Sequence, residues 1–161
     1  METLIVYAGN TGSTEKTADI VSQKLKNVKL VNLLQEDPDI SKFDLVVIGS
    51  NVRFGRLHKK ARNFIAKNKK ILLEKKAAYY ICCGFPEKQK EYFENSIPKE
   101  LLDKAVIYDS FGGELDLEKQ KGIDKLIVKM VDKATNGKKE VKLLYDHIES
   151  FVTILNKEIG S

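Results

Sequence analysis

The chain has 161 residues, of which 42% are hydrophobic and 32% charged, proportions typical of one soluble globular domain with one core. No apolar run approaches the roughly 20 residues needed to span a bilayer, and METLIVYAGN has neither a basic leader nor a small-residue cleavage site. We therefore expect one domain over residues 1–161 and a cytoplasmic location.

The net charge is positive, because 28 Lys and Arg residues exceed 23 Asp and Glu residues and give +5 at pH 7. Such a balance is compatible with a nucleic acid, an anionic membrane surface, an acidic small molecule or a plain lysine-rich surface. No recognisable nucleic-acid-binding module supports the first of these, so we expect no nucleic-acid partner.

Short apolar runs alternate with amphipathic segments along the whole chain. Strands are predicted at 3–8, 28–33, 43–49, 77–83 and 105–111. Helices are predicted at 15–25, 57–73, 98–104, 122–134 and 140–159, with a short helix or turn at 88–96. This alternation predicts an α/β fold with a parallel sheet covered by helices on both faces. Ligands of such sheets bind beyond the carboxyl ends of the strands.

The first strand-to-helix loop, YAGNTGSTEK (7–16), has the character of an anion site. The N–H groups at the start of a helix and the helix dipole favour a negative charge. Asn10, Thr11, Ser13 and Thr14 add neutral donors, which suit a terminal phosphate monoester. A plain tight turn is the alternative, although a turn needs glycine and not four adjacent hydrogen-bonding side chains.

Other phosphate-binding motifs do not match this loop. A nucleoside triphosphate loop requires G-x-x-x-x-G-K-[ST], whereas Gly12 is followed by Ser-Thr-Glu. A dinucleotide fingerprint requires G-x-G-x-x-G with an acid at the end of the second strand, which here ends in Val-Asn-Leu. A phosphoacceptor receiver domain carries acids after the first and third strands, where this chain has Gly9-Asn10 and Gly49-Ser50.

The stretch IVYAGNTGSTEKTA resembles the flavodoxin signature. The matching positions are Ile5, Val6, Tyr7, Gly12, Thr14 and Ala18. The family usually has Ser or Thr where this chain has Gly9. Because one hydroxyl is missing, we expect weaker binding of the phosphate. The resemblance implies FMN as cofactor and a flavodoxin-like, doubly wound sheet of five parallel strands in the order 2-1-3-4-5.

The same resemblance implies which residues bind the cofactor. The phosphate would be cradled by Gly9, Asn10, Thr11, Gly12, Ser13 and Thr14. One side of the isoalloxazine would be flanked by Ser50, Asn51, Val52, Arg53, Phe54 and Gly55. Its pyrimidine end would be approached by Cys83, Gly84 and Phe85.

Within the second loop two arrangements stay open. Either Phe54 stacks on the flavin ring or Arg53 lies over it, and Gly55 or the peptide beside it meets flavin N5 and tunes the redox behaviour. A core or partly exposed aromatic is the alternative for Phe54.

A second stretch, VVIGSNVRFGRLHKKARNFI, resembles the menaquinone-dependent protoporphyrinogen oxidase type, flavodoxin-fold enzymes of haem biosynthesis. That type is rich in Arg and aromatic residues where this chain reads GGELDLEKQKG. We therefore predict an FMN-binding flavodoxin-like redox protein, acting as an oxidoreductase or in electron transfer. The alternative is oxidation of protoporphyrinogen IX with a quinone acceptor.

The charge bears on the choice between carrier and enzyme. Carrier flavodoxins are typically acidic, whereas this chain is basic, which favours an enzyme acting on a small anionic or quinone substrate over transfer to a redox partner protein. Four lysines recur at every fourth residue of the 121–133 helix. That helix would contact an anionic membrane from the inner face, meet porphyrin propionates, or be a surface helix with solvated lysines. The pattern identifies no catalytic residue and no metal site, and His58 and His147 are expected at the surface.

Overall fold

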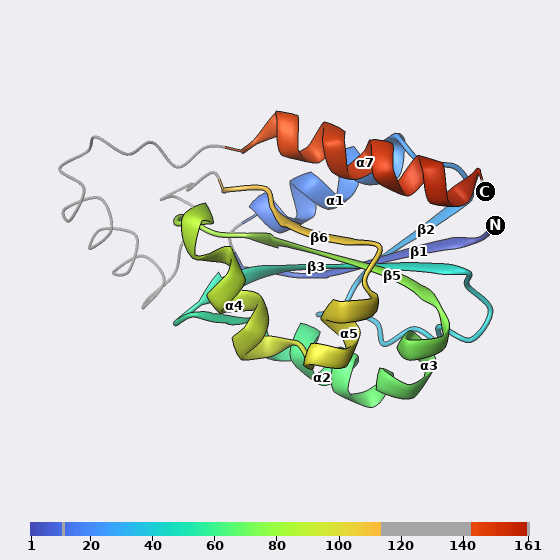
Figure 1. Ribbon diagram of the computed structural model, residues 1–161, viewed down its shortest axis with the longest axis horizontal. Helices are drawn as coiled ribbons and strands as arrows, with labels where there is room; N and C mark the ends of the chain where they lie inside the picture. The colour runs from blue at the N-terminus through green and yellow to red at the C-terminus, as the bar shows by residue number, and fades with distance from the viewer. Residues whose placement is uncertain (11, 114–142, 161) are drawn as a thin grey trace, which may run out of the picture.

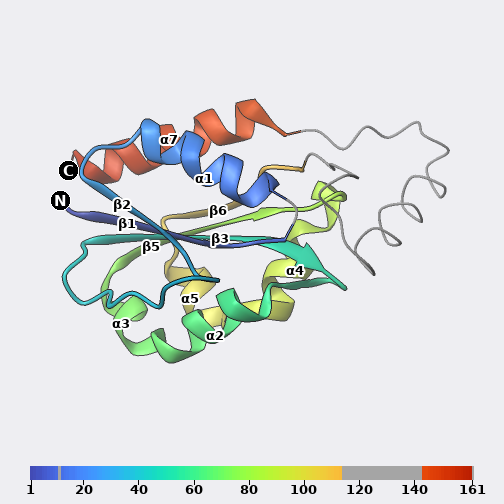
Figure 2. The ribbon, with the colours of Figure 1, turned by 180° about the vertical axis from the view of Figure 1, so that it is seen from behind.

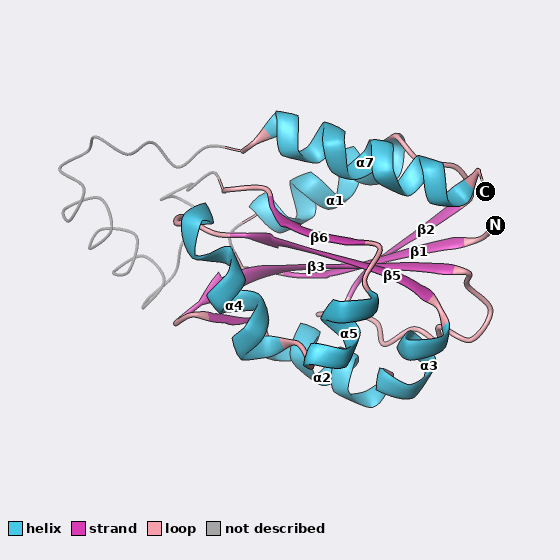
Figure 3. Ribbon diagram, viewed as in Figure 1, coloured by secondary structure: helices cyan, strands magenta, loops and turns pink. Residues whose placement is uncertain are grey.

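The computed structural model describes residues 1–10, 12–113 and 143–160 (Figure 1). A parallel sheet forms its centre, with the strand order β2-β1-β3-β5-β6. The strands are β1 (Thr3–Ala8), β2 (Val28–Asn32), β3 (Leu45–Arg53), β5 (Lys76–Cys82) and β6 (Ile107–Ser110). This confirms the predicted α/β class and strand order (Figure 3).

Helices cover both faces of the sheet (Figures 1 and 2). One face carries α1 (Ser13–Gln23) and α7 (Tyr145–Ile159). The other face carries α2 (Lys59–Lys67), α3 (Lys69–Glu74), the 3-10 turn η1 (Pro86–Lys88), α4 (Gln89–Ser96) and α5 (Lys99–Lys104). In the described part of the chain, no helix has the length and apolar character needed to cross a membrane.

The strands are apolar throughout because both of their faces are buried. In β1, Leu4 and Val6 pack under the helices α2 to α5, whereas Ile5 and Tyr7 pack under α1 and α7. Successive side chains of a strand point to opposite faces, so a strand buried on both faces needs a continuous apolar run. The apolar runs in the sequence therefore located these strands well.

The predicted helix at 57–73 is wrong in two places. Leu57 belongs to a short strand, β4 (Arg56–Leu57), that pairs antiparallel with the end of β3. His58 then caps α2, with its Nδ1 accepting a hydrogen bond from the Lys60 N–H at 3.0 Å. Asn68 separates α2 from α3, and its amide donates to the Phe64 carbonyl at 2.9 Å. Apolar spacing continues across this break, which is why periodicity alone predicted one helix.

Two further boundaries differ from the prediction. The strand predicted at 43–49 continues to Arg53, because β4 folds back on it as a hairpin. The terminal helix begins at Tyr145, since Leu143 forms an antiparallel bridge to Gly112 instead. The predicted helix at 122–134, with its proposed membrane contact, lies outside the described residues. The single domain over 1–161 likewise stays a prediction.

Candidate functional site

The carboxyl ends of β1, β3 and β5 bring the predicted loops to one edge of the sheet. Ala8 of β1 lies beside Ser50 of β3, and Asn51 of β3 lies beside Cys82 of β5. The chain leaves the three strands at neighbouring positions. Residues 9–14, 50–55 and 83–85 therefore gather there, apart from Thr11, which lies outside the described residues.

The first loop ends in a helix start suited to an anion. Gly12 is the N-cap of α1 with φ 89°, a left-handed conformation that glycine adopts without steric cost. Gly12 provides no side-chain cap for the N–H groups of the first turn. Those groups carry the positive end of the helix dipole, and Ser13 and Thr14 are buried beside them. Backbone N–H groups and neutral hydroxyls thus gather at this helix start.

The hydroxyl of Thr14 is a polar group of this loop whose hydrogen bonding is incomplete. Thr14 is only 1% exposed, and among the described residues its Oγ1 has no hydrogen-bond partner. A buried hydroxyl without a partner costs about 1–3 kcal/mol. A Cβ added to Gly9 would lie 2.6 Å from this Oγ1, so the hydroxyl lies directly against the Gly9 backbone. A phosphate oxygen in the loop would satisfy it.

Three residues that sequence reasoning missed hold the start of α1. The Tyr80 hydroxyl donates to the Thr14 carbonyl at 3.2 Å, and a Cβ on Gly49 would lie 2.0 Å from the Tyr80 ring. Only glycine at position 49 lets that ring cross the neighbouring strand. The Thr17 hydroxyl lies 2.9 Å from the Ser13 carbonyl and 3.0 Å from that of Thr14. The glycine within an otherwise apolar strand was the available signal.

The second loop is a tight hairpin turn between β3 and β4. Arg53 pairs with Arg56, and the two residues between them, Phe54 and Gly55, have φ values of 55° and 74°. Two successive positive φ values are the pattern of a type I′ turn, which normally carries Asn-Gly. A bulky residue in this conformation is strained by about 1–2 kcal/mol.

Phe54 lies at the tip of this hairpin and is 73% exposed, so it is not a core aromatic. The Arg53 guanidinium carbon lies 5.4 Å from the centroid of its ring. Arg53 and Phe54 therefore lie together, and which of the two side chains would lie over a flavin stays a prediction. A strained, exposed aromatic ring at the sheet edge indicates a binding surface.

The remaining residues of the second loop divide into two groups. The buried Ser50 hydroxyl donates to the Asn51 carbonyl and accepts from the His58 N–H, both at 2.8 Å. Val52 pairs with Leu57 across the hairpin. Ser50 and Val52 thus have structural roles, and their predicted contact with a cofactor stays a prediction. Asn51 is buried, and its Oδ1 accepts no hydrogen bond from any described residue.

The third loop follows β5 and is tied to the segment after β6. The Cys83 N–H donates to the Gly112 carbonyl at 2.8 Å, and its thiol lies 3.4 Å from the Ser110 hydroxyl. Gly84 and Phe85 are half-buried, and the Lys88 ammonium lies 5.7 Å from the centroid of the Phe85 ring. The third loop thus contains backbone and one half-buried aromatic ring at the end of β5.

The titratable side chains beneath the site have pKa values shifted by burial. Burial raises the pKa of the Cys82 thiol to about 12, a shift that the Thr17 hydroxyl, 3.5 Å from the Cys82 Sγ, opposes only weakly. Burial also raises the pKa of Tyr7, with Glu15 and Asp19 contributing in the same direction. These groups stay protonated at neutral pH, so the strand ends under the loops carry no charge of their own.

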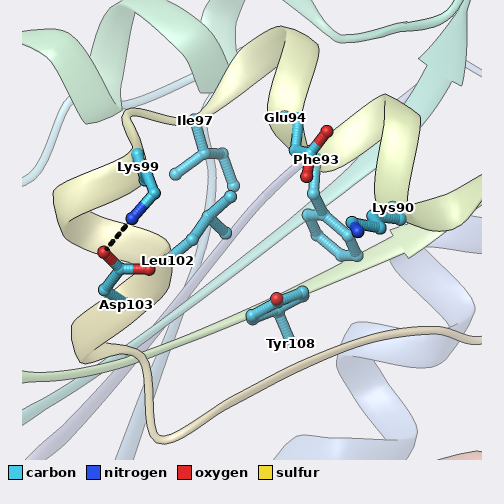
Figure 4. Close-up of a pocket in the computed structure, with 8 residues that line it drawn as sticks. All are labelled: Lys90, Phe93, Glu94, Ile97, Lys99, Leu102, Asp103 and Tyr108. Carbon is cyan, nitrogen blue, oxygen red and sulfur yellow. Dashed lines mark hydrogen bonds and ion pairs between the residues drawn. The ribbon is translucent and has the colours of Figure 1, made fainter.

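A separate pocket of about 330 Å³ lies between α4, α5 and the edge strand β6 (Figure 4). Phe93, Ile97, Leu102 and Tyr108 give it apolar walls, and charged residues stand at its rim, including a Lys99–Asp103 pair at 2.8 Å. None of its lining residues belongs to the predicted site. Helix α4 also contacts the hairpin, through Asn95 and Ser96, which do not line the pocket.

The two histidines have structural partners. His147 is 41% exposed, and its Nδ1 lies 2.9 Å from the Asp109 carboxylate, which joins α7 to β6. His58 is the half-buried cap of α2. The expectation of plain surface histidines was therefore incomplete for both.

Comparison with known proteins places this geometry in a family. The model of the flavodoxin domain matches residues 4–142. The protoporphyrinogen IX dehydrogenase [quinone] of Escherichia coli is 24% identical over 153 residues, covering 88% of this chain and 84% of that protein. An uncharacterized protein of Methanocaldococcus jannaschii is 34% identical over 106 residues, 65% of each chain.

A solved structure shows the same fold. The flavoprotein of Lactobacillus acidophilus, crystallised in complex with FMN, superimposes with a TM-score of 0.56 at 16% identity. The match covers 68% of this chain and 92% of that one.

Proposed function

We propose that this chain, which belongs to the flavodoxin domain family, binds FMN at the carboxyl edge of β1, β3 and β5 and acts as a redox protein. The observation that carries the proposal is the buried Thr14 hydroxyl, which has no hydrogen-bond partner among the described residues at a glycine-capped helix start. A phosphate monoester supplies the acceptor that this hydroxyl and the N–H groups of α1 lack.

The chain's residues fit the parts of FMN in turn. Thr14, Ser13 and the backbone from Gly9 to Gly12 would hold the phosphate, with Thr11 assigned by resemblance alone. The hairpin with Arg53 and Phe54 would cover one side of the isoalloxazine, because it offers an exposed ring beside a cation. The Cys83–Phe85 loop would approach the pyrimidine end. The bound flavin supplies one- and two-electron redox chemistry, which the protein orients and tunes.

The phosphate site uses no cation from its own loop. The described residues from Gly9 to Glu15 include neither Lys nor Arg, so hydrogen bonds and the helix dipole would carry the binding. That arrangement suits a single terminal phosphate and would leave the additional charge of a triphosphate uncompensated. It supports FMN over a nucleoside triphosphate.

The second candidate is a more specific oxidoreductase activity on protoporphyrinogen IX with a quinone acceptor. The identity with the Escherichia coli enzyme extends over 88% of this chain, which supports the candidate. The GGELDLEKQKG segment weighs against it, because the Arg and aromatic residues typical of that type are missing. We also propose that the reaction partner is a small anionic or quinone substrate or a redox partner protein. The helix predicted from the sequence at 121–133 would then contact the membrane peripherally.

The first experiment is an FMN titration of the flavin-free protein, followed by flavin fluorescence. We expect binding with micromolar affinity or better, and a protein that leaves FMN fluorescence unchanged would overturn the proposal. Anaerobic incubation of the holoprotein with protoporphyrinogen IX and a menaquinone analogue then tests the second candidate. Formation of fluorescent protoporphyrin above a flavin-free control supports the second candidate. If no protoporphyrin forms in a protein that binds FMN, the second candidate is excluded and the general redox role remains.

A further inference from the structure

The positive charge of the chain is concentrated in one segment, residues 53–70. This segment contains eight cationic residues and no Asp or Glu: Arg53, Arg56, Lys59, Lys60, Arg62, Lys67, Lys69 and Lys70. Because the whole chain has 28 Lys and Arg residues, 20 remain elsewhere, against 23 Asp and Glu residues. The rest of the chain is therefore net negative, and the excess of positive charge belongs to α2 and its two ends.

The solvent-exposed side of α2 carries only basic and neutral side chains. Its exposed residues are Lys59, Lys60, Asn63, Ala66 and Lys67. Arg56 before the helix and Lys70 after it are exposed as well. Lys67 forms an ion pair with Asp37, whereas the other four cations form no ion pair with any residue that the structure describes. We call these four, Arg56, Lys59, Lys60 and Lys70, the basic face.

Two cations of the basic face occupy positions that helix stability disfavours. Lys59 and Lys60 are the first two residues of α2, whose first turn contains no acidic residue. The start of a helix carries partial positive charge, so a cation there is destabilising and an anion stabilising. Helices α1, α4, α5 and α7 each have an acidic residue in the first turn. Residues that work against local stability are expected where they serve binding.

The basic face adjoins the candidate flavin site. The N–H of His58, the residue before α2, donates to the Ser50 hydroxyl at 2.8 Å, where β3 reaches the carboxyl edge of the sheet. Arg56 pairs with Arg53 in the hairpin that follows β3. A partner that docks on the start of α2 would therefore lie beside the loops proposed to hold the flavin.

The shape of this surface suits another protein. The hollow that Lys60 and Lys67 line has a volume of about 170 Å³, below the roughly 300 Å³ of pockets that hold small molecules. The apolar side chains of α2 are buried in the core, and its exposed side has no large hydrophobic residue. A helix that lies in a membrane surface needs a free apolar face. Exposed cations on a shallow surface are instead complementary to an acidic protein.

We propose that the basic face is the docking surface for a small acidic electron-carrier protein that exchanges electrons with the bound flavin. The inference rests on the proposed function and selects the redox protein among its candidate partners. Opposite charges steer the encounter of the two proteins, and short-lived redox complexes bury little surface. In each encounter from a reduced carrier, one electron leaves the carrier and enters the oxidised flavin.

The test measures electron transfer from reduced plant-type ferredoxin, a small acidic iron–sulfur protein, to the oxidised FMN-loaded chain by stopped-flow absorbance. The double variant Lys59→Glu with Lys60→Glu should lower the second-order rate constant about tenfold at low ionic strength. The difference should disappear in high salt, because salt screens exposed charges. The fold should be preserved, since the two carboxylates complement the dipole of α2.

The matched control is the double variant Lys26→Glu with Lys42→Glu. These exposed lysines precede β2 and β3, at the opposite edge of the sheet, and form no ion pair with a described residue. The control lowers the net charge by the same amount as the basic-face variant does. Its rate constant should differ from that of the wild type by less than about twofold, because steering depends on where the charge lies.

An unchanged rate constant in the basic-face variant, or an equal loss in the control, overturns the inference. Anionic phosphatidylserine vesicles test a membrane in its place. Vesicle binding that the basic-face variant loses while its electron transfer stays unchanged would also overturn the inference. If the wild type binds no FMN, the proposed function fails by itself. Amide NMR shifts of the flavin-free chain on addition of ferredoxin then still decide the docking surface: shifts at Lys59 and Lys60 support it, and their absence contradicts it.

Discussion

The hydroxyl of Thr14 lies in the space that a side chain at Gly9 would occupy. A Cβ at position 9 would be 2.6 Å from Thr14 Oγ1 and 2.7 Å from Thr14 Cβ. Real Cβ atoms do not approach other atoms so closely. The family's usual Ser or Thr at this position is therefore incompatible with Thr14 in its present place, and the Thr14 hydroxyl, five residues later, lies where the absent hydroxyl would begin.

This relationship predicts that restoring the family's residue will harm the protein. Gly9→Ser should lower the free energy of unfolding of the flavin-free protein by about 1–3 kcal/mol, the usual cost of overpacking. Adding Thr14→Ala should recover part of that loss, because it removes Oγ1 and Cγ2 and leaves only the Cβ contact at 2.7 Å. Urea unfolding of the two variants measures both effects. Equal destabilisation by Gly9→Ser in the presence and absence of Thr14→Ala would show that the two residues do not compete.

The strain at the hairpin tip predicts that a variant of Phe54 will gain folding stability and lose FMN affinity. Phe54→Asn places the preferred Asn-Gly pair in the type I′ turn, so the flavin-free protein should gain about 1 kcal/mol of stability. FMN affinity should fall about three- to tenfold, since one stacked ring is lost. Thermal unfolding and flavin titration measure the two changes.

The matched control for the hairpin is Phe54→Tyr, which keeps both the ring and the strain. Its stability and FMN affinity should stay close to those of the wild type. If Phe54→Asn binds FMN as tightly as the wild type does, Phe54 is no part of the flavin site.

The buried thiol predicts loss of stability in alkali. The pKa of Cys82 is raised from 9.0 to about 12 in the folded protein, so the folded state retains a proton that the unfolded state releases. This stabilisation is complete below about pH 9 and falls between about pH 9 and 12, by up to about 1.4 kcal/mol per pH unit.

The contribution of this thiol can be isolated with Cys82→Ala. Urea unfolding between pH 8 and about pH 10 should show a shallower decline in the variant. A residual decline is expected, because burial also raises the pKa values of Tyr79 and Tyr80. Identical pH profiles for variant and wild type would mean that Cys82 ionises as readily in the folded protein as in the unfolded one.

The sheet and the first loop could be predicted from the sequence because their signals are local. A continuous apolar run marks a strand buried on both faces, and the loop between residues 8 and 15 combines glycine with hydrogen-bonding side chains. The hairpin could not be predicted, since Arg53 to Leu57 show neither a strand period nor the usual Asn-Gly turn. Phe54 in a left-handed conformation runs against its own steric preference.

The residues that support the site could not be predicted from the sequence for a different reason. Tyr80 reaches Thr14 from 66 positions away, and Asn95 reaches Gly55 from 40 positions away. Such contacts depend on strand register and helix placement, which no local pattern contains. Tyr80 reads as an ordinary apolar strand residue, and Asn95 as a polar residue on an exposed helix face.

The measurement that tests the central claim most directly compares FMN with riboflavin, which lacks the phosphate, in the wild type and in Thr14→Val. The claim is that the start of α1 binds the phosphate. Thr14→Val should weaken FMN binding by about ten- to hundredfold, the worth of a hydrogen bond to a charged group, and leave riboflavin binding unchanged. The stability of the flavin-free variant should hold or rise, because the lost hydroxyl has no described partner. Thr153→Val, whose hydroxyl donates to the Glu149 carbonyl at 2.8 Å within α7, should spare FMN affinity. Equal loss of FMN and riboflavin binding in Thr14→Val, or no loss of either, would contradict the account.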